Sequence, residues 1–179
     1  NKIKNQIFIG PQSRFSNIKL SSTETKDKLV FVISGPEPQR TLFEDEIIRQ
    51  LKSSSFSALI IAGEPAKEYA IDINEKIKKV SHLKDAELAK ELKEAKVVFS
   101  RSGYSSIMDY AALNLKQLVL VPTSGQTEQE YLAEKLMLVK QCYSTSLSNL
   151  SIEEAVDKVK DYSGFEKDLV AENAKYREL

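Results

Sequence analysis

The sequence predicts an α/β fold, a Rossmann-like, doubly wound parallel sheet, because two textures alternate along the chain. Short, nearly continuous runs of Val, Ile and Leu occupy residues 28–34, 57–62, 96–101 and 117–122. Such runs are typical of strands that are buried on both faces of a parallel sheet. Segments with helical spacing of apolar residues separate them. Strands that alternate with helices across short loops favour a parallel sheet.

Five segments have the apolar spacing of amphipathic helices, and they cover residues 42–52, 85–95, 105–115, 127–139 and 151–160. Three helix starts fit the capping box, in which a Ser or Thr and a Glu three positions later bond each other's free N–H groups. The pairs are Thr41 and Glu44, Thr127 and Glu130, and Ser151 and Glu154. Residues 71–80 and 142–146 are weaker strand candidates.

Length and composition predict one globular domain with short extensions. The chain has 179 residues, of which 41% are apolar and 29% charged, ordinary values for a globular protein. We expect a linker at residues 1–27 and the Rossmann-like domain at residues 28–164. Gly164 breaks the chain before a final charged helix, which we expect at residues 165–179.

Charge and cysteine content exclude several classes of function. Lys plus Arg and Asp plus Glu each number 26, so no net field would attract nucleic acid or an anionic membrane. No apolar run approaches the ~20 residues of a membrane span, and no signal-like segment is visible, so we expect a cytoplasmic protein. The single cysteine, Cys142, permits no internal disulfide and is interpreted as a buried apolar residue.

The most informative loop follows the third apolar run. Ser102, Gly103, Ser105 and Ser106 are small, so a ligand can approach the backbone, and the free N–H groups of a helix start favour an anion such as a diphosphate. Asp109 lies one turn into the same helix, where its carboxylate could accept hydrogen bonds from ribose hydroxyls. A capped helix with an Asp that favours the helix dipole explains the same residues.

Two further loops follow predicted strands. Polar groups crowd a helix start at Gln126, Thr127, Gln129 and Glu130, and amide and carboxylate groups together suit sugar hydroxyls, which both donate and accept. A capping box accounts for Thr127 and Glu130 but leaves the two glutamines unexplained. The loop at residues 34–40 has the place of a phosphate loop, but its prolines remove N–H donors, and it matches neither a dinucleotide nor a Walker motif.

The sequence offers little for acid–base or metal chemistry. His82 is the only histidine, so a Ser-His-Asp triad or a two-histidine metal site has no second histidine to use. The sequence contains no D-x-D motif. We therefore predict neither a metal site nor a cofactor.

Together, in this order, the motif SRSG…Asp109 and the motif P-x-x-G-Q-T-E-Q-E-Y resemble the C-terminal, donor-binding domain of the GT-B glycosyltransferases of family 28. The resemblance covers roughly residues 7–160. It also extends to Gly10-Pro11-Gln12-Ser13-Arg14, which is similar to the linker motif of the family. Two positions depart from the family pattern: Asp109 stands where the family has Glu, and Glu130 stands where it has a second Gln.

The resemblance implies a role for each matching residue. The nucleotide would bind to His82, Leu83, Ser102, Gly103, Tyr104, Ser105, Ser106 and Asp109. The diphosphate would lie near Arg14, Ser34 and Gly35. The donor sugar would lie at Gly125, Gln126, Thr127, Gln129 and Glu130. The acceptor site and the general base lie mostly on the other domain in this family, so we assign no catalytic residue.

The resemblance therefore implies the UDP-sugar-binding domain of an inverting, metal-independent glycosyltransferase that transfers a hexosyl or N-acetylhexosaminyl group. The UDP-sugar is a substrate, and the expected partner is an N-terminal acceptor-binding domain or a separate chain that carries it. Two alternatives remain open. One is a non-catalytic donor-binding subunit that needs a partner chain, and the other is a nucleotide-sugar epimerase of similar fold.

Overall fold

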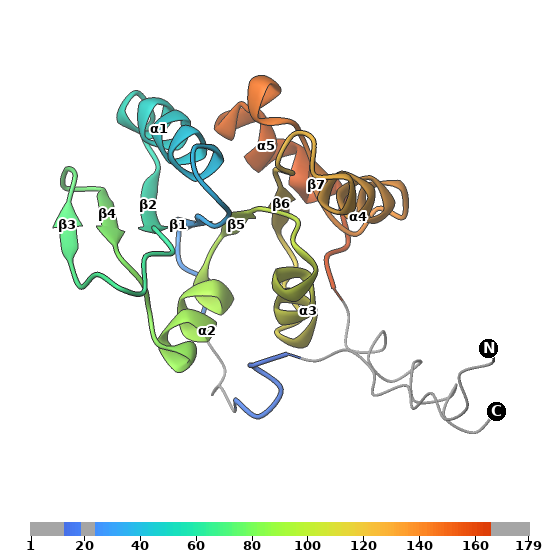
Figure 1. Cartoon of the computed structure of the whole chain (residues 1–179), viewed down its shortest axis with the longest axis horizontal. Helices are drawn as coiled ribbons and strands as arrows, with labels where there is room; N and C mark the ends of the chain where they lie inside the picture. The colour runs from blue at the N-terminus through green and yellow to red at the C-terminus, as the bar shows by residue number, and fades with distance from the viewer. Residues whose placement is uncertain (1–12, 19–23, 166–179) are drawn as a thin grey trace.

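The computed structural model describes residues 13–18 and 24–165. Most of the predicted linker and all but Phe165 of the predicted C-terminal helix lie outside the described residues. The described chain forms one seven-stranded sheet with the order β3-β4-β2-β1-β5-β6-β7 (Figure 1). The Rossmann-like α/β prediction is confirmed.

Six of these strands run parallel, and their bounds are β1 Lys28–Val32, β2 Ser57–Ile61, β4 Ile77–Val80, β5 Val97–Ser100, β6 Leu118–Leu120 and β7 Tyr143–Ser144. The edge strand β3, Ala70–Asp72, is antiparallel to β4. The weak strand candidate at residues 71–80 is therefore wrong as a single strand. A turn at Asn74 divides it, where the side-chain oxygen accepts the backbone N–H groups of Lys76 and Ile77.

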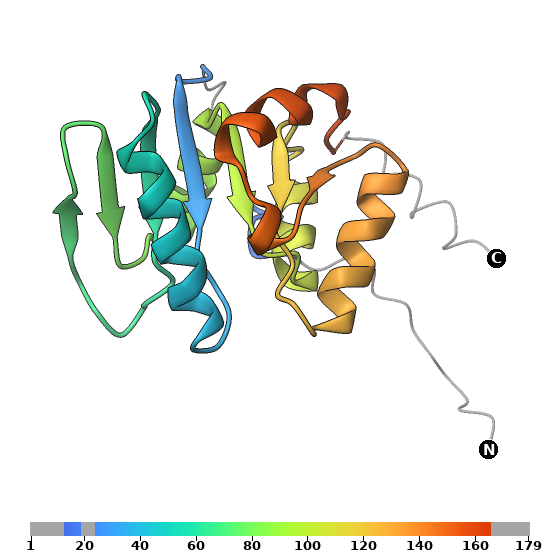
Figure 2. The same ribbon diagram turned by 90° about the horizontal axis from the view of Figure 1, so that it is seen from above.

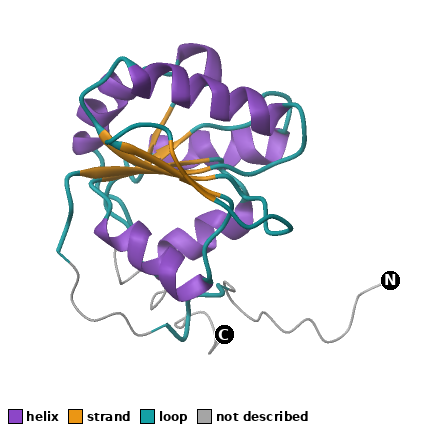
Figure 3. Cartoon of the chain, turned by 90° about the vertical axis from the view of Figure 1, so that its left-hand side faces the viewer, coloured by secondary structure: helices purple, strands orange, loops and turns teal. Residues whose placement is uncertain are grey.

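The helices are α1 Gln39–Lys52, α2 Asp85–Glu94, α3 Tyr104–Ala112, α4 Thr127–Leu138 and α5 Ile152–Lys158, with 3-10 turns at Leu147–Asn149 and Val159–Asp161. Helices cover both faces of the sheet (Figure 3). The apolar side chains of α2 and α3 join the core of one face, and those of α1 and α5 join the core of the other. Phe31 and Phe99 stack in this second core with their ring centroids 4.7 Å apart.

The strand order creates a topological switch point between β1 and β5. From β1 the chain crosses to β2 through α1, and from β4 it crosses back to β5 through α2 on the opposite face. Crossovers that leave in opposite directions open a crevice at the carboxyl ends of the two strands, and ligands of open α/β sheets bind in such crevices.

Two of the three predicted capping boxes are wrong. Helix α1 begins two residues before Thr41, whose hydroxyl donates to Glu37 at 2.8 Å instead. Helix α4 has Gln126 as its N-cap, so Thr127 is already the first helical residue. At the third start the predicted N-cap is confirmed, because the Ser151 hydroxyl accepts the backbone N–H of Glu154 at 3.3 Å.

Gly164 adopts a positive φ of 71°. A Cβ at this position would lie 2.3 Å from the Cα of Lys116 and 2.6 Å from the carbonyl oxygen of Leu115. Only glycine fits there, because the chain passes directly over the backbone that leads into β6. The glycine therefore allows the chain to pass close over the backbone of Leu115 and Lys116.

Candidate functional site

The parallel strands carry their loops to one edge of the sheet. Figure 2 shows the arrowheads of β1, β5 and β6 pointing to this edge. Three sequence-predicted loops meet here: residues 33–38 after β1, residues 101–103 after β5 and residues 121–126 after β6. The starts of α1, α3 and α4 lie at the ends of these loops.

The start of α3 lies just after the carboxyl end of β5. Gly103 is the N-cap in an extended conformation, and none of the described side chains caps this helix start. A Cβ at Gly103 would have no atom within 4 Å, and Tyr104 and Ser105 are exposed. The first-turn N–H groups therefore form a ready site for an anion.

Asp109 is buried in α3, with 6% of its surface exposed. Its Oδ1 accepts the hydroxyl proton of Ser13 at 2.7 Å, and its Oδ2 accepts Nε–H of Arg14 at 2.8 Å. Arg14 also pairs with the exposed Asp85 at 3.4 Å, through Nη1. Asp109 is therefore not a surface carboxylate that merely favours the helix dipole, because two specific donors satisfy it.

The segment that supplies these donors, residues 13–18, is held in place by Phe15. This side chain is 3% exposed and belongs to the same core cluster as the apolar face of α3. Arg14 lies over the ring of Phe15, with its guanidinium carbon 4.9 Å from the ring centroid. The backbone N–H of Phe15 donates to the Ser13 hydroxyl at 3.1 Å. Burial of Phe15 thus positions Ser13 and Arg14, the two residues that donate hydrogen bonds to Asp109.

The start of α4 is organised by its own loop. Gln129 Oε1 accepts the backbone N–H of Thr123 at 3.0 Å, and Gln129 Nε2 donates to Gln126 Oε1 at 2.5 Å. Glu130 Oε1 accepts the backbone N–H of Gly125 at 2.9 Å, and Gly125 has a φ of 81°. Glu130 therefore bonds to the loop before α4 and does not form a capping box with Thr127.

One hydrogen bond joins the two helix starts. The buried hydroxyl of Ser102, in the turn before α3, donates to the backbone carbonyl of Gln129 at 2.8 Å. The predicted nucleotide turn and the predicted sugar residues are thus neighbours in space, although 27 positions separate these two residues.

The remaining predicted residues line the same edge. Ser34 is half-buried and Gly35 exposed, with a φ of 108°, in the loop after β1. His82 and Leu83 lie between β4 and α2. The hydroxyl of Ser81 lies 3.1 Å from Nδ1 of His82, and Leu83 packs against the core on the α3 side.

Arg101 lies at the same edge of the sheet, and sequence reasoning did not single it out. It is 2% exposed, and its Nη1 donates to the carbonyls of Val121 and Pro122 at 3.0 and 3.2 Å. Its Nη2 donates to the carbonyl of Gln39 at 2.8 Å. Burial lowers the pKa of this guanidinium to about 10, which keeps it charged at neutral pH. Through these hydrogen bonds Arg101 connects the ends of β5 and β6 to the start of α1.

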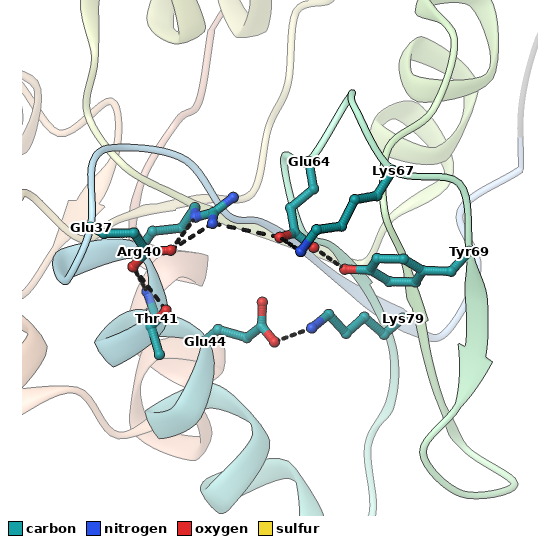
Figure 4. Close-up of a pocket in the computed structure, with 8 residues that line it drawn as sticks. All are labelled: Glu37, Arg40, Thr41, Glu44, Glu64, Lys67, Tyr69 and Lys79. Atoms are coloured by element: carbon teal, nitrogen blue, oxygen red, sulfur yellow. Dashed lines mark hydrogen bonds and ion pairs between the residues drawn. The ribbon is translucent and has the colours of Figure 1, made fainter.

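A polar cavity of roughly 440 Å³ lies between the start of α1 and the loop after β2 (Figure 4). Glu64 is its hub, since Lys67 donates to it at 2.7 Å and Tyr69 donates to its other oxygen. Hydrogen bonds from Lys67 and Tyr69 lower the pKa of Glu64 to about 2. Three acidic and three basic residues line the cavity, so its charges balance.

Two absences hold for the described part of the chain. No group of three or more His, Cys, Asp or Glu side chains gathers there in a way that would hold a metal ion. No described helix combines the length and the apolar character that crossing a membrane requires.

A family model for the C-terminal domain of glycosyltransferase family 28 matches residues 29–178. The chain belongs to glycosyltransferase family 28. A comparison with curated protein sequences finds no match. The family match overlaps the predicted resemblance over residues 29–160, and it includes the starts of both α3 and α4.

Solved structures show the same fold for this family 28 domain. The glycosyltransferase of kitacinnamycin has a TM-score of 0.57 at 13% identity, and the match covers 84% of this chain and 39% of that one. The MurG structure from Acinetobacter baumannii has a TM-score of 0.54 at 15% identity, covering 84% and 44%. The chain thus spans less than half the length of either protein.

A third similar structure is a short chain. The solution structure of ALG13 has a TM-score of 0.53 at 13% identity, and the match covers 82% of this family 28 domain and 96% of ALG13. The fold therefore occurs both within longer glycosyltransferases and as nearly the whole of a solved chain.

Proposed function

We propose that this family 28 domain binds a UDP-sugar in the crevice between β1 and β5, as the donor-binding half of an inverting, metal-independent glycosyltransferase. The observation that supports this most strongly is the pair of adjacent helix starts joined by Ser102. One presents free N–H groups to an anion, and the other presents amide and carboxylate groups to hydroxyls.

The diphosphate is assigned to the start of α3, between the Ser102–Ser106 turn and the loop at Ser34 and Gly35. Negative charge develops on UDP as the bond to the sugar breaks. Preorganised N–H groups stabilise such charge without reorganising. Arg14 is the cation of residues 13–18, and its exposed side chain already bonds Asp109 on α3. These groups supply the positive potential that this mechanism places at the leaving group.

The ribose is assigned to Asp109. Each carboxylate oxygen has two lone pairs, and in this structure Ser13 and Arg14 each use one. Ribose hydroxyls would bind either by adding to these bonds or by displacing Arg14 toward the diphosphate. Under both arrangements the linker segment and the nucleotide share one carboxylate.

The acceptor and the general base are assigned to an N-terminal domain that faces the same edge of the sheet. An acceptor hydroxyl that attacks the anomeric carbon from the side opposite UDP inverts its configuration in one displacement. One alternative is favoured by a specific finding. The match that covers 96% of ALG13 shows that this fold can make up nearly a whole chain, as a donor-binding subunit completed by a partner chain would require.

Titration of the chain with UDP, ADP and GDP by calorimetry tests the proposal, together with backbone NMR shifts. We expect weak binding of UDP in preference to ADP and GDP, with shifts concentrated between Ser102 and Asp109. Binding is expected to be weak because only one wall of the crevice is present. Preference for ADP, or an absence of shifts in this turn on addition of UDP, would overturn the assignment.

A further inference from the structure

A pocket of roughly 680 Å³ lies between α1 and the loops that follow β6 and β7. One wall is the side of α1 that carries Gln39, Leu42 and Glu46. The opposite wall consists of loop residues, which are Pro122, Ser124, Ser146, Leu147 and Ser148. We call it the serine pocket, after its three serines, all of which are exposed. Among the lining residues, Glu130 alone is shared with the residues assigned to the donor sugar, so the pocket is a separate site.

Arg101 joins the two walls of the serine pocket. Its Nη2 donates to the carbonyl of Gln39 on α1, and its Nη1 donates to the carbonyls of Val121 and Pro122 in the loop after β6. Arg101 also lines the pocket, although only 2% of its surface is exposed. Its three hydrogen bonds therefore set the spacing of the walls at this end.

Gln50 joins the walls further along α1. Its Nε2 donates to the carbonyl of Leu150 at 2.6 Å, and its Oε1 accepts the backbone N–H of Ile152 at 2.8 Å. Leu150 directly follows the 3-10 turn that contains Ser148. Because the walls are joined at both ends, the serine pocket is preformed, and a ligand would not have to open it.

The charge of Arg101 has no carboxylate partner among the described residues. Burial is the only cause that shifts the pKa of this guanidinium, so no neighbouring acid offsets the cost of burying it. The ring of Phe43, whose centroid lies 4.2 Å from the guanidinium carbon, and three carbonyl oxygens surround the cation but carry no net charge. Its Nε has no hydrogen-bond partner in the described chain. Buried charges in proteins are usually paired, so an unpaired cation beside a preformed pocket indicates an anionic ligand.

Two carboxylates line the serine pocket, and both are bonded elsewhere. The oxygens of Glu46 accept hydrogen bonds from Arg49 and Gln50. Glu130 accepts the backbone N–H of Gly125. The guanidinium of Arg101 and the serine hydroxyls are therefore the groups that attract an anion to this pocket.

We propose that the serine pocket is a second ligand site, which binds an oxyanion group, a phosphate or a carboxylate, on a small molecule with an apolar portion. The serine hydroxyls donate to the oxyanion, and the buried charge of Arg101 attracts it with less screening than a surface charge would experience. The apolar portion lies against Leu147 and Leu42, of which Leu42 is 49% exposed. The oxyanion also supplies the partner that a buried cation normally has.

Three matched probes test the proposal by NMR titration of the chain. Phenyl phosphate and benzoate carry an oxyanion on an aromatic ring, and benzyl alcohol carries the ring without the charge. We expect saturable shifts at Ser124 and at residues 146–148 with at least one of the anions, and about tenfold weaker binding of benzyl alcohol. The two anions distinguish a phosphate site from a carboxylate site. Titrations are run with and without UDP, because the start of α3 is an alternative anion site.

A substitution at the rim of the pocket tests the role of charge. Ser148→Glu adds a carboxylate, and we expect it to weaken binding of the preferred anion about tenfold, because the new charge repels the ligand and offers Arg101 a partner. Ser55→Glu is the matched control, since it makes the same change at an exposed serine that does not line the pocket. Affinity in this control stays near wild type. Melting temperatures verify that both variants fold.

The outcomes that overturn the proposal are distinct from those that test the proposed function. Equal affinities for benzyl alcohol and both anions would show that the charge of Arg101 plays no part. Shifts confined to residues 102–106 would place the anion at the start of α3 instead. Equal losses in Ser148→Glu and Ser55→Glu would show that net charge, and not the pocket, controls affinity. Each of these results would overturn the proposal, and none of them bears on whether UDP binds.

Discussion

The two helix starts in the crevice are built in opposite ways. Asp109 on α3 is completed by Ser13 and Arg14, which lie 96 and 95 positions earlier in the chain. Gln129 and Glu130 on α4 are completed by backbone groups no more than six positions away. The first site therefore depends on the linker segment, and the second depends on its own loop. The proposed nucleotide half should respond to changes in the linker, while the proposed sugar half should not.

The largest effect is expected from Phe15→Ala. Truncating a buried phenylalanine costs about 3–5 kcal/mol of unfolding free energy, and here it also releases Ser13 and Arg14 from Asp109. We expect thermal unfolding to show this loss and calorimetry to show weaker UDP binding. Leu51→Ala is the control, because Leu51 is equally buried in the core of the opposite face. A matching loss of UDP affinity in Leu51→Ala would mean that general destabilisation, not the linker, weakens the site.

A smaller effect tests the ribose assignment at α3. Asp109→Ala should lower UDP affinity by roughly 1.5–3 kcal/mol, the range for a hydrogen bond to a charged group. The loss should be much smaller for 2′,3′-dideoxy-UDP, which lacks the two hydroxyls. Calorimetric titration of both ligands compares them directly. Equal losses would show that Asp109 serves to hold Arg14 and not to bind ribose.

The local construction of the α4 start predicts a still smaller and more selective change. Glu130→Ala removes the acceptor for the Gly125 N–H, which should cost about 0.5–1.5 kcal/mol of stability. Affinity for a UDP-sugar should fall, and affinity for UDP should stay at the wild-type value. Parallel measurements of melting temperature and of both affinities decide this. A drop in UDP affinity would show that the proposed nucleotide site also depends on the loop before α4.

The smallest effect lies outside both helix starts, at Glu64. Its pKa is lowered to about 2 by Lys67 and Tyr69, so its stabilising contribution is present above pH 4.5 and is lost as pH falls toward 2. The stabilities of wild type and Glu64→Gln should therefore converge as pH falls from 4.5 toward 2. Its partner Lys67 is exposed, so solvent screens the ion pair and the difference at neutral pH should be small. Curves that stay parallel down to pH 2 would show that this carboxylate carries no such linkage.

The fold was predictable because local signals agree with the tertiary arrangement. The apolar runs of β1, β2, β5 and β6 are buried on both faces, and their pattern is visible without any partner. The antiparallel β3 was not separated from β4, because the turn at Asn74 interrupts a stretch that has no clear period. Helix starts were less predictable, since Thr41 and Thr127 fit a capping box by spacing although the helices begin elsewhere.

The sequence predicted which loops lie at one edge of the sheet but not the contacts between them. The motifs place Asp109 on α3 and Gln129 on α4, in the helices that follow two of these loops. The bond from Arg14 to Asp109 depends on where Phe15 packs, which no local spacing encodes. In the sequence, Arg101 is simply the last residue of an apolar run. Its carbonyl partners follow from the tertiary positions of α1 and β6, which the sequence pattern does not show.

The hydrogen bond from Ser102 to the carbonyl of Gln129 sets the distance between the two helix starts. Both groups are anchored, one in a buried turn and the other in helical backbone, so the two starts cannot slide apart independently. In the proposed donor complex, this spacing would have to match the length of the bridge between nucleoside and sugar. A bridge of two phosphates and a bridge of one differ in length by one phosphate unit, and a rigid spacing can match only one of them. Selection for the length of the ligand would then precede any selection for the identity of its sugar.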